Sequence, residues 1–170
     1  MKKIIMMMFL LSCMQLYAMD HALDVEKIKP QALILGSGES RVFAFLDPLC
    51  SKSQNYLEMI AGNEKLLKQK TFYLYLYRLP KFESDRLIEH IYSAKEPLQM
   101  MKNVMIGKFF PKTYRMKITA QGQKVKAKIK RIADGFGAKR RPYLLLFNKG
   151  SNYCKVSEGS APCLDPSSKK

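Results

Sequence analysis

The feature that most constrains the fold is a strand-like run that leads straight into a helical pattern, with a cysteine at the junction. Residues 41–46 (RVFAFL) are apolar, aromatic and β-branched, which is typical of a strand. Asp47-Pro48 ends this run, because proline cannot continue a central strand. Apolar residues then recur at helical spacing at Tyr56, Leu57, Ile60 and Ala61. The sequence therefore places Cys50 where a strand hands over to the N-terminus of a helix.

Further strands and helices are predicted on both sides of this unit. The strands are a short one over 31–35, a buried central one over 71–79, and a terminal hairpin over 143–147 and 152–156. The helices are one around 87–92 with Glu83 and Ser84 as N-terminal signals, one from Pro97 to Gly107, and a lysine-rich one over 121–135. This order predicts an α/β protein with a mixed central sheet covered by helices.

The first eighteen residues have the order of a secretory signal peptide. Met1-Lys2-Lys3 gives a positive start, residues 4–11 form an unbroken apolar run, and cleavage is expected after Ala18. A second interpretation stays open, because Leu10-Leu11-Ser12-Cys13 resembles a lipobox in which Cys13 would be lipidated and kept. Both interpretations predict an exported protein, and the expected compartment is the periplasm.

The chain is strongly basic, with 30 Lys and Arg against 14 Asp and Glu. Its formal net charge of +16 falls to +14 once Lys2 and Lys3 are removed with the signal peptide. Such a charge favours an anionic envelope surface, for example lipid headgroups, cell-wall polymers or acidic proteins. We expect no nucleic acid partner for an exported chain. A generally basic composition without any specific partner explains the charge equally well.

Three cysteines remain after cleavage, and an odd number in an oxidising compartment leaves one thiol unpaired or capped. We expect a disulfide between Cys154 and Cys163, because Gly159 and Pro162 let the short loop between them fold back. Two alternatives remain: Cys163 could serve as a remote resolving cysteine for Cys50, or both could be free thiols.

Cys50 is the candidate nucleophile. Unpaired N–H groups and the positive end of the helix dipole stabilise a thiolate at a helix N-terminus, and Lys52 adds positive charge. The thiolate is the form that attacks disulfides. The alternative is a buried, inert cysteine, but Pro48 and the polar residues 51–53 favour an exposed loop.

Four stretches, in this order, resemble the DsbC/DsbG periplasmic disulfide isomerases. RVFAFLDPLCSKS resembles their active-site segment of strand, Asp, Cys-x-x-Cys and helix, and YLYRLPKFESD is similar to the next strand and its exit. IYSAKEPLQMMKNVMIGK is similar to their helical insertion, and GAKRRPYLLLFNKG to the final strand, which the family enters through a cis-proline facing the active site.

The resemblance runs from about residue 42 to residue 150 and implies a thioredoxin-like fold with a helical insertion. From this resemblance together with the N-terminal pattern, we expect the chain to divide into a signal peptide (1–18), a lead-in with the first strand (19–40), a thioredoxin-like domain (41–156) and a polar tail (157–170). The resemblance also implies that Pro142 is cis and lies near Cys50.

The departures from that family bear on the chemistry. Ser53 stands where the second active-site cysteine is expected, and Arg141 precedes the proline where a small hydroxyl residue is usual. The last helix of the family has no counterpart in the polar tail, and no segment matches its N-terminal dimerisation domain. A mixed disulfide on Cys50 therefore cannot be resolved by a second thiol in the same motif, although the Ser53 hydroxyl could donate a hydrogen bond to the thiolate.

Three functional hypotheses follow from the sequence. The first is a single-cysteine disulfide isomerase or reductase of the cell envelope, with Cys50 and Ser53 as catalytic residues and Lys52, Arg141 and Pro142 contacting the substrate. It would act on extended or misfolded envelope proteins, with a redox partner and without a metal or other cofactor. The second is a redox-inactive, thioredoxin-like module that binds peptides as a chaperone or secretion component, because the long Arg141 side chain could obstruct or re-specify the groove. The third is a basic structural protein in which Cys50 is incidental.

Overall fold

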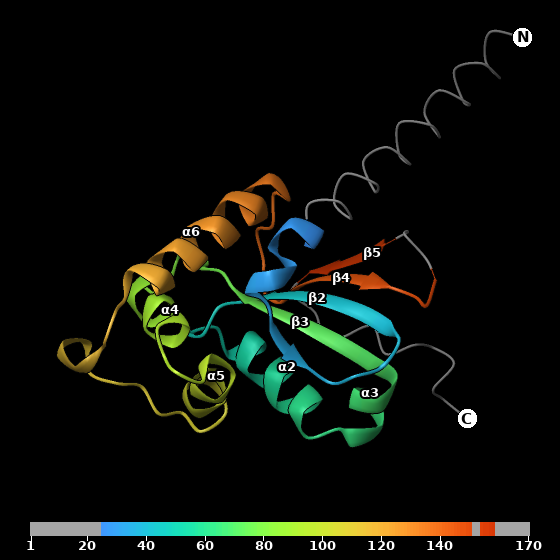
Figure 1. The fold of residues 1–170 in the computed structure, drawn as a ribbon, viewed down its shortest axis with the longest axis horizontal. Helices are drawn as coiled ribbons and strands as arrows, with labels where there is room; N and C mark the ends of the chain where they lie inside the picture. Colours follow the sequence, from blue (N-terminus) through green and yellow to red (C-terminus); the bar gives the residue numbers. More distant parts are fainter. Residues whose placement is uncertain (1–24, 151–153, 159–170) are drawn as a thin grey trace, which may run out of the picture.

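The protein is built on one mixed five-stranded sheet, seen in a computed structural model that describes residues 25–150 and 154–158 (Figure 1). The strands are β1 (Leu33–Leu35), β2 (Ser40–Leu46), β3 (Lys70–Leu76), β4 (Tyr143–Phe147) and β5 (Cys154–Glu158). Their order in the sheet is β1-β3-β2-β4-β5. The central strand β2 is parallel to β3 and antiparallel to β4, and the two outer pairings are antiparallel. The predicted mixed sheet is thus confirmed.

The helices pack around this sheet in two groups. They are α2 (Ser51–Ala61), α3 (Glu64–Gln69), α4 (Asp85–Tyr92), α5 (Pro97–Met105) and α6 (Ala120–Gly135), with single 3-10 turns at Lys29–Gln31 and Thr113–Arg115. α2 contacts α5, while α4 packs against α6. Figure 1 shows α2 and α3 below the sheet and α6 above it. No helix in the described part of the chain is long and apolar enough to cross a membrane.

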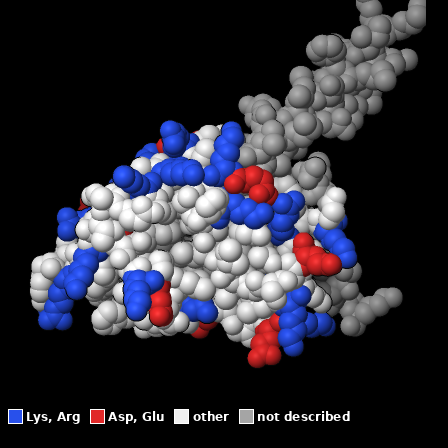
Figure 2. All heavy atoms as spheres, viewed as in Figure 1, with Lys and Arg blue, Asp and Glu red and all other residues white. Residues whose placement is uncertain are grey.

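α6 combines a buried stripe with a basic outer face. Ile129 and Ala133 are fully buried, whereas Lys124 and Lys130 are exposed. Figure 2 shows the resulting row of Lys and Arg side chains along the upper edge, where α6 lies. The helix predicted over 121–135 is therefore confirmed as an amphipathic element.

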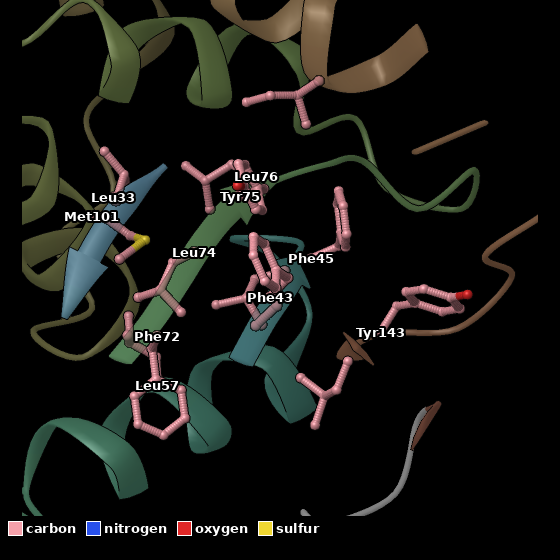
Figure 3. Close-up of a cluster of buried hydrophobic side chains, with 14 of the residues drawn as sticks. Leu33, Phe43, Phe45, Leu57, Phe72, Leu74, Tyr75, Leu76, Met101 and Tyr143 are labelled. Atoms are coloured by element: carbon pink, nitrogen blue, oxygen red, sulfur yellow. The ribbon is translucent and has the colours of Figure 1, made fainter. Parts of the chain in front are cut away.

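The register between β2 and β3 stacks aromatic rings on one face of the sheet. Phe43 lies opposite Tyr73 and Phe45 opposite Tyr75, with ring centroids 4.8 and 5.1 Å apart. Phe136, at the end of α6, meets Phe45 edge-on at 5.5 Å. Figure 3 shows Phe43, Phe45 and Tyr75 within the buried cluster. Because alternate residues face opposite sides of a sheet, Val42, Ala44 and Leu46 are left for the other face, where α2 packs.

Several predicted boundaries need correction. The strand expected over 31–35 is only β1, because residues 29–31 form a 3-10 turn, and the strand expected over 71–79 ends at Leu76. β5 continues to Glu158, with Ser157 opposite Leu144, so the predicted start of the tail at residue 157 is wrong. α3 was not predicted. Its six residues are too few to show a helical period.

Some predictions lie outside the described residues. These are the signal peptide over 1–18, lipidation of Cys13 and the Cys154–Cys163 disulfide, since Cys163 is not described and Cys154 is described only through its backbone in β5. They stay predictions.

Candidate functional site

Cys50 lies at the junction that the sequence predicts, as the N-cap residue of α2 with extended backbone angles of φ −86° and ψ 116°. The first turn of α2 carries no acidic residue and includes Lys52. Cys50 is only 6% exposed, so the expectation that it lies in an exposed loop is wrong. Its thiol is instead reached through a pocket.

The pocket beside Cys50 has a volume of about 390 Å³ and a strongly basic rim. Leu79 and Pro80, which follow β3, form an apolar part of its wall. The cationic residues around it are Lys52, Lys81, Lys139, Arg140 and Arg141. Three of the predicted site residues, Cys50, Lys52 and Arg141, therefore line one pocket.

Ser53 is fully buried one turn into α2. Its Oγ accepts a hydrogen bond from the backbone N–H of Asp47 at 3.2 Å. The Cys50 N–H donates to the Asp47 carbonyl at 3.0 Å, which closes the same turn from the other side. Ser53 therefore supports the loop that carries Cys50.

Asp47 is the residue that sequence reasoning missed. Its carboxylate is completely buried, with Oδ1 accepting from the Leu49 N–H at 2.9 Å. Oδ2 accepts from the Leu79 N–H at 2.5 Å and from the Ser84 hydroxyl at 3.1 Å. One side chain thus fixes both the Cys50 loop and the opposite wall of the pocket.

Burial raises the pKa of Asp47 above its usual value, because the charged form is poorly solvated there. The hydrogen bonds from Leu79, Leu49 and Ser84 and the positive charge of Arg141 oppose this effect without cancelling it. Ser84 occupies the predicted N-cap of α4, but its hydroxyl donates to Asp47 and its oxygen accepts no capping hydrogen bond from the helix.

Gln54 ties the Cys50 loop to the segment after α5. Its Nε2 donates to the Pro48 carbonyl at 2.7 Å, and its Oε1 accepts from Lys108 Nζ at 2.7 Å. Sequence reasoning missed this contact as well, because Gln54 and Lys108 are far apart in the chain.

Arg141 is held inward, with 2% of the residue exposed. Its guanidinium donates to the carbonyl oxygens of Arg140 (2.8 Å), Tyr77 (3.2 Å), Ala138 (3.3 Å) and Arg78 (3.5 Å). It also lies 4.2 Å from the centre of the Tyr77 ring. The hypothesis that a projecting Arg141 side chain obstructs the groove is therefore wrong; the side chain joins the pocket wall to the end of β3.

The Arg141–Pro142 peptide bond is cis, as predicted. Pro142 is buried and leads directly into β4, which pairs with the strand that precedes Cys50. Since Arg141 and Cys50 line the same pocket, the proline segment lies beside the cysteine. Within the described residues, no three His, Cys, Asp or Glu side chains gather as metal ligands.

The sequence matches no protein-family model and no curated protein, but its structure is similar to several solved ones. A disulfide interchange protein from Neisseria gonorrhoeae has a TM-score of 0.59 at 17% identity, over 80% of this chain and 90% of that one. DsbA2 from Pseudomonas aeruginosa has a TM-score of 0.57 at 14% identity, over 76% and 86%. ScsC from Proteus mirabilis in a transitional conformation has a TM-score of 0.63 at 12% identity, over 92% and 83%.

The chain has the thioredoxin fold. Its structural neighbours are thiol–disulfide interchange proteins, and they carry the names DsbA and ScsC. The finer resemblance to DsbC and DsbG stays a prediction. On the thioredoxin fold found here, the N-cap cysteine of α2 and Arg141, the residue before the cis-proline, line one basic pocket, which is an arrangement that can bring a substrate disulfide to the cysteine.

Proposed function

We propose that this protein is a thiol–disulfide exchange protein of the cell envelope that uses Cys50 as its single nucleophile in a Cys-x-x-Ser site. The observation that carries the proposal is the position of Cys50 at the N-terminus of α2, in a pocket that it shares with the cis-proline segment. The disulfide interchange proteins among the structural neighbours support it, and the N-terminal sequence supports export.

The exchange begins when the Cys50 thiolate attacks one sulfur of a substrate disulfide. A bond forms between Cys50 Sγ and that sulfur, the original disulfide breaks, and its electron pair leaves on the second substrate sulfur as a thiolate. Lys52 and Arg141 line the pocket in which this attack takes place.

Ser53 decides how this mixed disulfide is released. A serine cannot attack it, so release needs a thiol from the substrate or from solution. Isomerisation and reduction are compatible with this chemistry, whereas net oxidation by this motif alone is not. Extended or misfolded envelope proteins are the proposed substrates.

A redox-inactive peptide-binding role is the second candidate. The burial of Cys50 favours it, because only a small part of the residue is open to a substrate. In this role the pocket beside Cys50 and Pro142 would hold an extended peptide without covalent chemistry.

Rescue of an isomerase-deficient periplasm separates the two candidates. Wild-type protein is expected to restore the folding of a substrate with non-consecutive disulfides, and Cys50→Ala is expected to lose that activity. Ser51→Ala is a matched control, since this exposed neighbour carries no part of the proposed chemistry. Equal rescue by wild type and Cys50→Ala would remove the thiol from the mechanism and leave the peptide-binding role.

A further inference from the structure

The charge around the Cys50 pocket points to a particular class of thiol. Four basic residues with exposed side chains, Lys52, Lys81, Lys139 and Arg140, line it together with Cys50, and none of the acidic residues that the structure describes lines it. The basic residues come from three separate segments of the chain, so no single helix or loop accounts for the cluster. The Asp47 carboxylate, which does not line the pocket, is buried and accepts hydrogen bonds from three donors.

We infer that this pocket binds the anionic group of a low-molecular-weight thiol, which releases substrates from Cys50. This inference rests on the proposed function and names the reductant that the Cys-x-x-Ser site requires. A volume of about 390 Å³ lies within the range of small-molecule sites. Clefts lined by one sign of charge raise the local concentration and the association rate of ligands of the opposite sign.

The release balances with two equivalents of the small thiol. The first, as thiolate, attacks Cys50 Sγ; the Cys50–substrate bond breaks, and the electron pair leaves with the substrate sulfur as a thiolate. The second attacks the small thiol's sulfur in the new mixed disulfide, which forms a small-molecule disulfide and returns Cys50 as a thiolate. The substrate disulfide is reduced and the two small thiols are oxidised.

Three thiols of similar size and different charge test the inference. The probes are 2-mercaptoethanesulfonate (anionic), 2-mercaptoethanol (neutral) and cysteamine (cationic), each used to displace 5-thio-2-nitrobenzoate from Cys50. Each rate is divided by the rate of the same thiol with a neutral small disulfide, which removes intrinsic differences in nucleophilicity. The Cys50→Ala protein supplies the background from other cysteines.

We expect the normalised rate to be about tenfold higher for the anionic than for the cationic thiol at low salt, and the ratio to shrink as salt screens the charges. The double variant Lys139→Gln with Arg140→Gln should reduce the differences between the normalised rates of the three thiols. Lys65→Gln with Lys68→Gln, an equal charge change on α3, should leave these differences unchanged, because α3 precedes β3 at the other end of the parallel β2–β3 pair from Cys50.

Three outcomes would overturn the inference. Equal normalised rates for the three thiols would show that the pocket does not select anions. The same would follow if the α3 control variant reduced the differences between the thiols as much as the pocket variant does. In both cases Cys50 would remain a reactive thiol. Failure of all three thiols to react would overturn the proposed function together with the inference.

A different observation concerns the segment between α5 and α6, residues 106–119. Phe109, Phe110 and Tyr114 are 64%, 44% and 74% exposed, and they are three of the four large apolar residues found exposed in the described chain. Lys112, Arg115 and Lys117 are interleaved with them and are exposed too. Residues 97–133 contain no Asp or Glu at all.

The two ends of this segment are held by hydrogen bonds, while its tip, residues 109–117, is largely exposed. Lys108 Nζ donates to Gln54 Oε1 at one end, and the Thr119 N–H donates to Ser93 Oγ at 2.9 Å at the other. Figure 1 shows the tip, in yellow, at the left-hand edge of the molecule, and Figure 2 shows blue side chains at the same edge. An exposed aromatic tip on a fixed base is not needed to complete the core.

We propose that this tip docks on an anionic lipid bilayer. Aromatic rings favour the membrane interface, and cations next to them are attracted to anionic headgroups. The exposed aromatic residues and the interleaved basic residues therefore both fit an anionic bilayer. Because Gln54 joins the base of the segment to the Cys50 loop, docking would hold the thiol close to the membrane surface.

Co-sedimentation with vesicles tests the docking. We expect binding to vesicles of phosphatidylglycerol and phosphatidylcholine and little binding to phosphatidylcholine alone. Lys112→Gln with Arg115→Gln should weaken binding by roughly tenfold or more, and Phe109→Ser with Phe110→Ser should weaken it at high salt, where the apolar contribution dominates. Lys65→Gln with Lys68→Gln again supplies the matched charge control.

Equal binding to both vesicle types, or equal loss in the α3 control, would overturn the docking proposal. Single-stranded DNA forms the competing arm, because aromatic and basic residues together also stack on and neutralise nucleic acid. Tight binding of DNA to this segment without binding to anionic vesicles would overturn the proposal too.

Discussion

Asp47 gives a prediction in which charge and hydrogen bonding can be separated. Asp47→Ala would leave the Leu79 N–H and the Ser84 hydroxyl, both buried, and the partly buried Leu49 N–H without their acceptor. An unpaired buried donor costs about 1–3 kcal/mol, so this variant should lose at least about 2 kcal/mol of stability. Asp47→Asn keeps one oxygen acceptor in place and is the milder probe.

The effect of burial on Asp47 is tested by comparing how the stability of the wild type and of Asp47→Asn depends on pH. Because burial raises the pKa of Asp47, the folded state holds its proton at pH values where the unfolded state has released it. The contribution of Asp47 is therefore fully present below its unfolded pKa and is lost as the pH rises through the higher folded pKa. Each unit of difference corresponds to about 1.4 kcal/mol.

Urea unfolding of wild type and Asp47→Asn, from pH 4 to pH 8, measures this effect. The stability of the wild type relative to the asparagine variant should fall as the pH rises and then level off. A difference that is flat, or that grows with pH, would contradict the argument, because it would mean that the carboxylate is stabilised in its charged form.

Three further predictions concern single side chains. Tyr75→Phe should be neutral or stabilising by up to about 1 kcal/mol, because the buried Tyr75 hydroxyl has no hydrogen-bond partner among the described residues. Tyr92→Phe should cost about 1–3 kcal/mol, because it leaves the Leu76 N–H without an acceptor. Equal melting temperatures of the two variants would refute the contrast. Ser53→Cys should form a disulfide with Cys50 and gain oxidase activity, and thiol counting with and without reductant detects the disulfide. The control Ser51→Cys, one residue from Cys50, should form no such disulfide. An unchanged thiol count in Ser53→Cys would refute the prediction. Arg141→Met should lower the free energy of unfolding by about 3 kcal/mol, because it removes the charge-assisted hydrogen bonds of the guanidinium. Arg141→Lys should restore only part of that stability, since an ammonium lacks the planar arrangement of donors. An unchanged urea midpoint for Arg141→Met would show that those bonds contribute nothing.

The parts of the site that the sequence predicts are those set by local pattern. Cys50 could be placed at the N-terminus of α2 because a strand, a proline and a helical period follow one another within about twenty residues. The cis peptide bond at Pro142 came from the resemblance, since composition and spacing do not distinguish cis from trans.

The parts that escaped prediction are set by contacts between distant segments. Two partners of the Asp47 carboxylate, Leu79 and Ser84, lie 32 and 37 residues further along the chain, so the sequence around Asp47 does not reveal them. The sequence left open whether the long Arg141 side chain obstructs or re-specifies the groove. It did not predict the burial of Arg141, because the partners of this side chain are backbone carbonyls, which leave no trace in the amino-acid pattern. The burial of Cys50 follows from the same contacts, because the walls of its pocket come from segments after β3 and before β4.

The buried side chains of Asp47 and Arg141 also explain why the charge of the pocket can be changed without unfolding the protein. Asp47 and Arg141 are buried, act on each other electrostatically, and have most of their polar atoms satisfied by backbone groups. The rim cations, such as Lys139 and Arg140, are exposed and contribute little to folding. Changes at Asp47 or Arg141 should therefore alter stability, whereas changes at the rim should alter the rate with charged thiols at nearly constant stability. If Lys139→Gln with Arg140→Gln unfolded the protein as readily as Arg141→Met, this division between buried support and exposed rim would be wrong.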